Sequence, residues 1–225
     1  MKKAGMLVAV EMDAVFQRFG NALEPVHMPG YEVYRFLLGE TELFVLSSGE
    51  GEIAAAAGTQ LLISVFGAEV VFNFGVVGGL TEEMSLARTC VVERVVHYDF
   101  DISALDPVKP GQYTRFADEY IPISQALVEK AVAVEPSLKR VTCASGDKFV
   151  AEREKKQALH DRFDADICEM EAAAIALTCH RSGIPCLMIK TVSDSIDGGA
   201  AEFKKAVLSS AELCLKVTEK ILREL

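Results

Sequence analysis

Two acidic clusters stand next to apolar segments that are built to be buried. Glu169-Met170-Glu171 precedes an alanine-rich run, and Ser193-Asp194 closes a run of isoleucine, leucine and methionine. A carboxylate that is moved out of water into such surroundings needs a partner, a shifted pKa or a ligand. Buried carboxyl groups of this kind are typical of catalytic sites, where they act as acids, bases or stabilisers of positive charge.

Each cluster also has a purely structural explanation. Acidic residues are favoured in the first turn of a helix by the macrodipole, which accounts for one glutamate before Ala172. It does not easily account for both Glu169 and Glu171. Ser193 and Asp194 could simply end a strand and enter a turn. The two explanations are evenly balanced for each cluster alone.

A glycine-rich segment follows a predicted strand at residues 70–74. It reads Gly75-Val76-Val77-Gly78-Gly79. Glycines here let backbone N–H groups approach a ligand at the carboxyl end of a strand, where open α/β sheets bind small molecules. The spacing is that of neither a dinucleotide-binding nor a phosphate-binding loop. A tight turn is an equal alternative.

A second segment, Ser145-Gly146-Asp147-Lys148-Phe149, follows a predicted strand at 140–144. Asp147 suits a helix cap, and Phe149 suits either the core or a position stacked on a flat ligand. Taken alone, the structural roles are favoured. Glycines, an aromatic side chain and two carboxylate clusters at the ends of predicted strands together strengthen the functional interpretation.

The elements that must position these residues are short apolar runs alternating with helical patterns, which predicts an α/β fold. We predict strands at 5–10, 31–38, 43–47, 70–74, 90–97, 140–144 and 186–192, and helices at 51–66, 124–134, 152–162, 170–181 and 200–225. The expected architecture is a single domain over residues 1–225, with a mixed, mostly parallel central sheet flanked by helices on both faces. Residues 31–47 should form a hairpin around Gly39. The irregular stretch 99–122 is expected to be a lid, interface or binding loop.

The composition narrows the classes of partner. The formal net charge of -10 argues against nucleic acid and anionic membranes, which are bound through Lys and Arg. The six scattered cysteines are expected to be reduced core residues, and the four histidines are isolated, so no metal or organic cofactor is implied. No run reaches the ~18–20 apolar residues of a membrane span. We therefore expect a cytoplasmic protein that binds a small molecule.

Five segments, in this order along the chain, resemble the nucleoside phosphorylase and nucleosidase superfamily. They begin at Ser48, Asn73, Ser145, Glu169 and Val192. The resemblance extends over essentially the whole chain and is greatest to the bacterial 5'-methylthioadenosine/S-adenosylhomocysteine nucleosidases. It implies hydrolysis of the N-glycosidic bond of an adenine nucleoside, a step in methionine salvage that gives adenine and a 5-substituted ribose.

The resemblance also implies a role for individual residues. Asp194 would give or share a proton at adenine N7 as general acid, with Ser193 orienting it. Glu171 would accept hydrogen bonds from the ribose hydroxyls and stabilise the positive sugar. Met170 would pack against that sugar. The other implied binding residues are Val76, Val77, Gly78, Phe149 stacked on adenine, Val150 reading its edge, and Glu169.

Four positions depart from the family pattern. Asp13 stands where the family has its water-activating glutamate, with Glu11 as a weaker candidate. Lys190, which the resemblance implies as a substrate-binding residue near the nucleophile, replaces an arginine. The lysine keeps the charge but loses the fork of donors. Val76 replaces a serine. Glu50 replaces an apolar residue near the 5' substituent, where it would suit an amino-bearing tail, or else it points to solvent.

Water is favoured over phosphate as the nucleophile. The phosphorylases of the superfamily bind phosphate through arginines, whereas this chain has Asn73 at one such place and no basic residue between Ala4 and Gln17. The alternatives are a phosphate-dependent purine nucleoside phosphorylase and a non-catalytic nucleoside-binding protein. The resemblance further implies a homo-oligomer, most simply a dimer, with Ile102 and Leu105 in the region that would cross to the partner.

Overall fold

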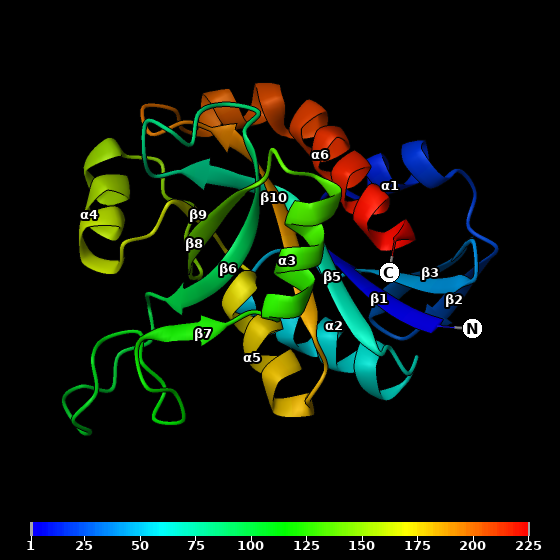
Figure 1. The fold of residues 1–225 in the computed structure, drawn as a ribbon, viewed down its shortest axis with the longest axis horizontal. Coiled ribbons are helices and arrows are strands. Elements are labelled where there is room, and N and C mark those ends of the chain that lie inside the picture. Colours follow the sequence, from blue (N-terminus) through cyan, green and yellow to red (C-terminus); the bar gives the residue numbers. More distant parts are fainter. Residues whose placement is uncertain (1, 225) are drawn as a thin grey trace.

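The computed structural model describes residues 2–224 and shows an α/β fold around one mixed sheet (Figure 1). The strands are β1 (Lys2–Val8), β2 (Glu24–Met28), β3 (Tyr31–Leu38), β4 (Thr41–Ser47), β5 (Val70–Gly79), β6 (Thr89–His97), β7 (Tyr120–Pro122), β8 (Lys139–Ser145), β9 (Ile167–Glu169) and β10 (Cys186–Asp194). The helices are α1 (Met12–Phe19), α2 (Glu52–Ser64), α3 (Gln125–Val134), α4 (Arg153–Phe163), α5 (Ala172–Ser182) and α6 (Ala200–Arg223). The predicted fold class is confirmed. Leu225, the end of the predicted last helix, lies outside the described residues.

The sheet is open at one end and closes on itself at the other. Its strand order is β10-β6-β8-β9-β5-β1-β4-β3-β2, and β10 also pairs with β5. Strands β5, β10, β6, β8 and β9 thus form a small barrel, and β1 to β4 extend it as an open sheet. Pairing is parallel for β1 with β4 and β5, and for β5 with β10, as expected for a core covered by helices on both faces.

The register brings four strand ends to one point. Gly78 near the end of β5 pairs with Asp194 of β10 and with Cys168 of β9. Glu169 at the end of β9 pairs in turn with Ser145 at the end of β8. The register of β10 shifts at Ser193, between Val192 and Asp194, which is the mark of a bulge. Bulges re-aim side chains at barrel rims, so this one sets where the last two residues of β10 point.

Several predicted boundaries were wrong, and two of them matter for the site. The glycine segment 75–79 is not a loop after a strand but the last half of β5, because its backbone pairs with β10 and β9. Gly79 is required there, since a Cβ would lie 2.1 Å from the carbonyl oxygen of Met84. Strand β1 ends at Val8, two residues earlier than predicted, and α1 follows where no helix was expected. The predicted β3–β4 hairpin is confirmed, with Gly39 at a φ of 63°.

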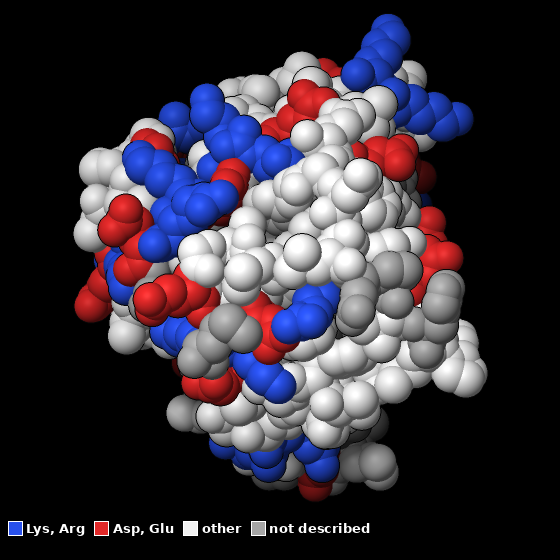
Figure 2. All heavy atoms as spheres, turned by 90° about the vertical axis from the view of Figure 1, so that its right-hand side faces the viewer, with Lys and Arg blue, Asp and Glu red and all other residues white. Residues whose placement is uncertain are grey.

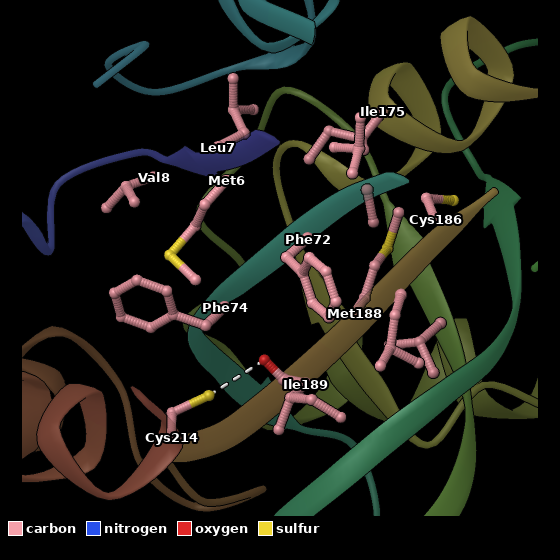
Figure 3. Packing of buried hydrophobic residues seen from close by; sticks show 14 of the residues in the cluster. Met6, Leu7, Val8, Phe72, Phe74, Ile175, Cys186, Met188, Ile189 and Cys214 are labelled. Atoms are coloured by element: carbon pink, nitrogen blue, oxygen red, sulfur yellow. Dashed lines mark hydrogen bonds between the residues drawn. The ribbon is translucent and has the colours of Figure 1, made fainter. Parts of the chain in front are cut away.

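Helices cover both faces of the sheet. Helices α2 and α5 pack together on one face, and α6 with α1 packs on the other (Figure 1). The core between them contains Met6 of β1, Phe72 and Phe74 of β5, and Ile189 of β10 (Figure 3). The thiol of Cys214 in α6 donates a hydrogen bond to the Ile189 carbonyl oxygen at 2.9 Å. All six cysteines are buried and free, so they contribute to the core as small apolar side chains.

The surface carries charges of both signs. On the face shown in Figure 2, basic and acidic side chains are intermixed around a broad area without charged residues. Within residues 2–224, no helix combines the length and the apolar character needed to cross a membrane. Among the side chains that the structure describes, which do not include those of Glu24, Pro25 and His27, no group of three or more His, Cys, Asp or Glu is placed to hold a metal ion.

Candidate active site

The converging strand ends surround a cavity of about 550 Å³. This volume suits a ligand of nucleoside size. It is lined by Ala9, Val10, Glu11, Glu50, Val76, Val77, Gly78, Lys148, Phe149, Val150, Cys168, Glu169, Met170, Glu171, Ser193, Asp194, Phe203, Val207 and Leu208. Buried carboxylates line part of it, and apolar side chains from β5, α6 and the segment after β8 form its walls.

Glu11, not Asp13, is the carboxylate that β1 delivers to the cavity. Glu11 is only 6% exposed, and its Oε1 accepts a hydrogen bond from the Val76 N–H at 3.1 Å. Its Oε2 accepts another from the Val10 N–H at 3.0 Å. Asp13 is exposed in the first turn of α1 and does not line the cavity. The placement expected of Asp13 was therefore wrong, because β1 stops at Val8 and the chain turns before Glu11.

Glu169 holds the start of α5 in place. Its carboxylate accepts hydrogen bonds from the backbone N–H groups of Glu171 and Ala172 at 3.0 and 2.9 Å. The first N–H groups of a helix have no acceptor within the helix, and this carboxylate provides one for them. Its negative charge also interacts favourably with the positive end of the helix macrodipole. The Lys190 ammonium group lies 3.3 Å from Glu169 Oε2, and both side chains are buried. Glu169 thus has the structural role considered from the sequence, although it also lines the cavity.

Lys190 lies behind the carboxylates rather than in the cavity. It is 2% exposed and is not one of the lining residues, which corrects its placement as a substrate-binding residue. Burial alone would lower the pKa of Lys190, but the charges of Glu169 and Glu171 raise it above its usual value. The lysine is therefore a fixed positive charge that compensates the acidic cluster from behind.

Glu171 faces the cavity and is held by α2. Its Oε1 accepts a hydrogen bond from the Gly51 N–H at 2.8 Å, and its side chain is largely buried. Burial and the neighbouring Glu169 raise the pKa of Glu171 to about 7, while Lys190 and the Gly51 hydrogen bond oppose this shift. This carboxyl group therefore titrates near neutral pH.

The last residue of β8 and the segment after it form hydrogen bonds with both α2 and α5. Ser145 Oγ donates to Glu52 Oε1 at 2.6 Å and accepts from the Ala173 N–H at 3.0 Å. Asp147 Oδ1 accepts from the Glu52 N–H at 2.8 Å, so Asp147 does cap a helix, but the helix is α2 and not the next one in the chain. Burial and Glu169 raise the pKa of Glu52 to about 8. These bonds fix the helix ends that hold Glu171.

Asp194 is the most deeply buried carboxylate of the cavity, at 1% exposure. Ser193 Oγ donates to its Oδ1 at 3.1 Å. The ammonium group of Lys156, a residue of α4, lies 2.6 Å from its Oδ2, and the Lys156 side chain is fully buried. The expected proximity of Ser193 to Asp194 is thus present, together with a cationic partner that no sequence pattern indicated.

Apolar side chains close the remaining walls. Phe149 is 46% exposed, and its ring meets that of Phe203 edge to face with centroids 5.4 Å apart. Val150 and Met170 line the same cavity, and Val207 and Leu208 add the surface of α6. A flat apolar ligand would gain burial and ring contacts between these side chains.

Most of the residues predicted from the sequence come together in this one cavity. They are Glu50, Val76, Val77, Gly78, Phe149, Val150, Glu169, Met170, Glu171, Ser193 and Asp194. Asp13 and Lys190 do not line it, and Glu11 does. The sequence reasoning missed Lys156 and the α6 residues Phe203, Val207 and Leu208. The three α6 side chains lie on one side of an amphipathic helix, and this pattern could have indicated them from the sequence. No sequence pattern indicated Lys156.

Comparison with known proteins agrees with this geometry. A family model described as the phosphorylase superfamily matches residues 5–225. An aminodeoxyfutalosine nucleosidase of Helicobacter pylori strain J99 is 30% identical, with 100% of both chains covered. A 5'-methylthioadenosine/S-adenosylhomocysteine nucleosidase of an Exiguobacterium species is also 30% identical, covering 97% of this chain and 98% of the relative.

A crystal structure of a Helicobacter pylori 5'-methylthioadenosine/S-adenosyl homocysteine nucleosidase superimposes on the whole chain. The TM-score is 0.94 at 28% identity, with 100% of this chain and 99% of the other covered. That protein was crystallised in complex with a pyrrolidinol that carries a 4-amino-pyrrolo[3,2-d]pyrimidinyl-methyl group and a propynylthio-methyl group. The likeness therefore extends over the complete fold.

Proposed function

Because the chain belongs to the phosphorylase superfamily and, within it, to the 5'-methylthioadenosine/S-adenosylhomocysteine nucleosidases, we propose that it hydrolyses the N-glycosidic bond of an adenine nucleoside. The observation that carries this proposal is one cavity of about 550 Å³ in which Glu11, Glu171 and Asp194 face a common space. Carboxylates placed in this way suit a sugar that becomes positive as its purine departs.

The proposed reaction assigns one task to each carboxyl group. The bond between C1' and N9 breaks and its electron pair goes to the purine, while Asp194 in its protonated form gives a proton to N7, so that adenine leaves as a neutral base and Asp194 becomes a carboxylate. Glu171 accepts hydrogen bonds from the ribose hydroxyls, and its negative charge stabilises the ribosyl cation. Glu11 takes a proton from water as the water oxygen bonds to C1'. The products are adenine and a 5-substituted ribose.

Asp194 depends on its surroundings for orientation. Ser193 holds one carboxyl oxygen and Lys156 the other, which leaves little freedom for the group to turn. The apolar side chains Phe149 and Met170 would contact the base and the sugar, and the backbone of Val150 would read the edge of the base. Exclusion of water by these walls strengthens each charge–charge interaction in the cavity.

Water rather than phosphate is the proposed nucleophile. Among the described residues that line the cavity, Lys148 is the only cation, and it pairs with Asp99 at 2.7 Å. A phosphate dianion would therefore enter a cavity dominated by carboxylates, which is unfavourable. Hydrolysis needs no second anionic substrate.

The 5' end of the substrate would lie toward the mouth of the cavity. Glu50 lines the cavity and is exposed, and Phe203 and Leu208 of α6 line the same cavity. We propose that Glu50 favours a tail with an amino group, as in S-adenosylhomocysteine, over a bare methylthio group. Aminodeoxyfutalosine, the nucleoside for which one relative is named, is a third candidate.

Release of free base tests the function directly. The protein is incubated with 5'-methylthioadenosine, S-adenosylhomocysteine, aminodeoxyfutalosine, adenosine and inosine, with and without inorganic phosphate, and the products are separated by chromatography. We expect adenine and an unphosphorylated sugar at a rate that phosphate does not change. A phosphorylated sugar would establish a phosphorylase instead, and binding without release would establish a non-catalytic nucleoside-binding protein.

We also propose a cytoplasmic homodimer that acts in methionine salvage. The buried free thiols suit a reducing compartment. Leu105 and Ile53 are 87% and 85% exposed, which is unusual for large apolar side chains on a chain of net charge -10 and favours a contact between subunits. Light scattering should give twice the chain mass, and Leu105→Glu with Ile53→Glu should reduce it to a monomer. An unchanged dimer in the double variant would place the interface elsewhere.

A further inference from the structure

Lys156 is a buried cation that has no part in the bond-breaking or proton-transfer steps of the proposed reaction. It lies in the first turns of α4, is fully buried, and has three oxygen atoms around its ammonium group. Asp194 Oδ2 and the Ser195 carbonyl oxygen are each 2.6 Å from Nζ, and the Gly198 carbonyl oxygen is 3.1 Å away. An ammonium group has three N–H donors, so all of them are satisfied.

We propose that Lys156 is a positioning residue that makes Asp194 a stronger general acid and fixes its orientation. This inference rests on the proposed function. After Asp194 has given its proton to the purine, a buried carboxylate remains, and the adjacent ammonium ion stabilises exactly that product of the transfer. Lys156 does not line the cavity and has no free donor, so it acts through Asp194 rather than on the substrate.

The groups around Asp194 leave Lys156 as its compensating charge. Asp194 is contacted by Ser193 from its own strand, and Cys168 of β9 lies close by, since a Cβ on Gly78 would be 3.2 Å from Asp194 Oδ2 and 3.1 Å from the Cys168 sulfur. Burial raises the pKa of the Cys168 thiol to about 12, so this neighbour is neutral. Among the described residues, Lys156 is therefore the positive charge that compensates Asp194.

Lys156 also joins the acid to the wall of the cavity. The loop that supplies Ser195 and Gly198 to the lysine is tied to α6, because the Ser195 N–H and Oγ both contact Glu202 Oε2, at 2.6 and 2.9 Å. Phe203 follows Glu202 directly and lines the cavity. A change at Lys156 should thus affect substrate affinity as well as proton transfer.

The test compares Lys156→Met and Lys156→Arg with a matched control, Lys155→Met. Lys155 is the adjacent residue, is exposed and pairs only with Glu152 on its own helix. The variants are first checked for folding by circular dichroism. Values of kcat and KM for 5'-methylthioadenosine are then measured from pH 5 to pH 10.

We expect Lys156→Met to lower kcat by roughly 30- to 100-fold, which is less than the loss of a general acid itself because the residue acts through Asp194. The alkaline limb of its pH profile should move to higher pH, because the ammonium ion that favours a negative charge beside it is gone. Lys156→Arg should keep part of the activity and the same alkaline limb as the wild type. Lys155→Met should match the wild type in both kcat and pH profile. A folded Lys156→Met with an unchanged limb and kcat within about twofold would overturn the inference.

If Lys156→Met does not fold, a double-mutant cycle tests the inference instead. Asp194→Asn is compared with Asp194→Asn combined with Lys156→Met, which no longer leaves a buried carboxylate unpaired. If the lysine acts through Asp194, the second substitution should lower the residual kcat no further, whereas multiplied losses would contradict the inference. A wild-type protein that releases no base would instead refute the proposed function, so the two failures are distinguishable.

Discussion

The three carboxyl groups of the cavity differ in what surrounds them. Glu11 accepts two backbone N–H bonds, Glu171 accepts one and has Glu169 as a neighbour, and Asp194 has a buried ammonium ion. The same chemical group thus meets three environments, and environment decides whether a carboxyl group acts as base, charge stabiliser or acid. At the scale of single residues, these differences give the proposed division of labour.

Substitution of Glu11 and of Asp13 tests which of the two carboxylates takes the proton from the attacking water. Glu11→Gln should lower kcat by about 10²- to 10⁴-fold, since an amide cannot accept the proton from water. Asp13→Asn should change kcat by no more than about twofold, because Asp13 is exposed and outside the cavity. Steady-state kinetics with 5'-methylthioadenosine gives both numbers. The reverse order of effects would restore Asp13 as the base.

The acid limb of the pH profile should report Glu171. Its pKa is raised to about 7, and the proposed role needs the ionised form, which is present above that value. We therefore expect kcat/KM to fall about tenfold per pH unit as the pH drops below about 7. Activity that stays flat down to pH 5.5 would exclude a charged Glu171 as a requirement.

At the scale of elements, helix ends hold the catalytic side chains. Gly51 at the start of α2 binds Glu171, and Glu169 binds the start of α5. Glu52 joins the two helices, with Ser145 Oγ on one carboxyl oxygen and the Ala174 N–H on the other at 2.5 Å. The hydrogen bonds of this junction are strong, but Glu52 is a buried acid with no cation next to it among the described residues. The contribution of Glu52 to the stability of the fold therefore depends on pH.

Glu52→Gln should reduce the pH dependence of stability. In the folded protein the pKa of Glu52 is raised from 4.5 to about 8, so its protonated form stabilises the fold below pH about 4.5, and this contribution is lost as the pH rises through about 8. Glutamine resembles the protonated acid, since its carbonyl oxygen can accept from the Ala174 N–H and its amide group can donate to Ser145 Oγ. Between pH 5 and 8.5 the melting temperature of the wild type should fall by at least about 3 °C more than that of the variant. Parallel melting curves would contradict the assignment.

At the scale of the whole molecule, no single element makes the cavity. Its walls come from segments that begin near Ala9, Glu50, Val76, Lys148 and Cys168 and end with Leu208 of α6. The barrel closure between β5, β9 and β10 brings these segments to one place. Only the complete fold therefore binds the ligand, and ligand binding must stabilise the complete fold.

Adenine should raise the melting temperature of the protein. At a concentration 100 times its Kd, a ligand that binds only the folded state contributes about 2.7 kcal/mol. For a domain of this size this corresponds to a shift of roughly 5–10 °C. Asp194→Asn should reduce the shift, and Glu11→Gln should not, because Glu11 serves the water and not the base. Calorimetry that shows no shift with adenine would contradict the purine site.

The sequence by itself determined the α/β class, most of the long strands and helices, and eleven of the residues that line the cavity. Side-chain periodicity indicates which segments are buried, and glycine and acidic residues near strand ends indicate a site. The resemblance to the nucleosidases added the other lining residues, such as Glu50 and Val150. The glycine segment after Phe74 was recognised as part of the site, although its strand conformation was not.

Tertiary structure alone decided the choice between Glu11 and Asp13 and the partner of Asp194. The first depends on where β1 stops, and strand boundaries are set by pairing with β4 and β5 rather than by local preference. The second joins residues 38 positions apart in sequence. A lysine in a charged helix looks like a solvated side chain until the fold places it against a buried carboxylate, because burial is a property of packing and not of sequence neighbours.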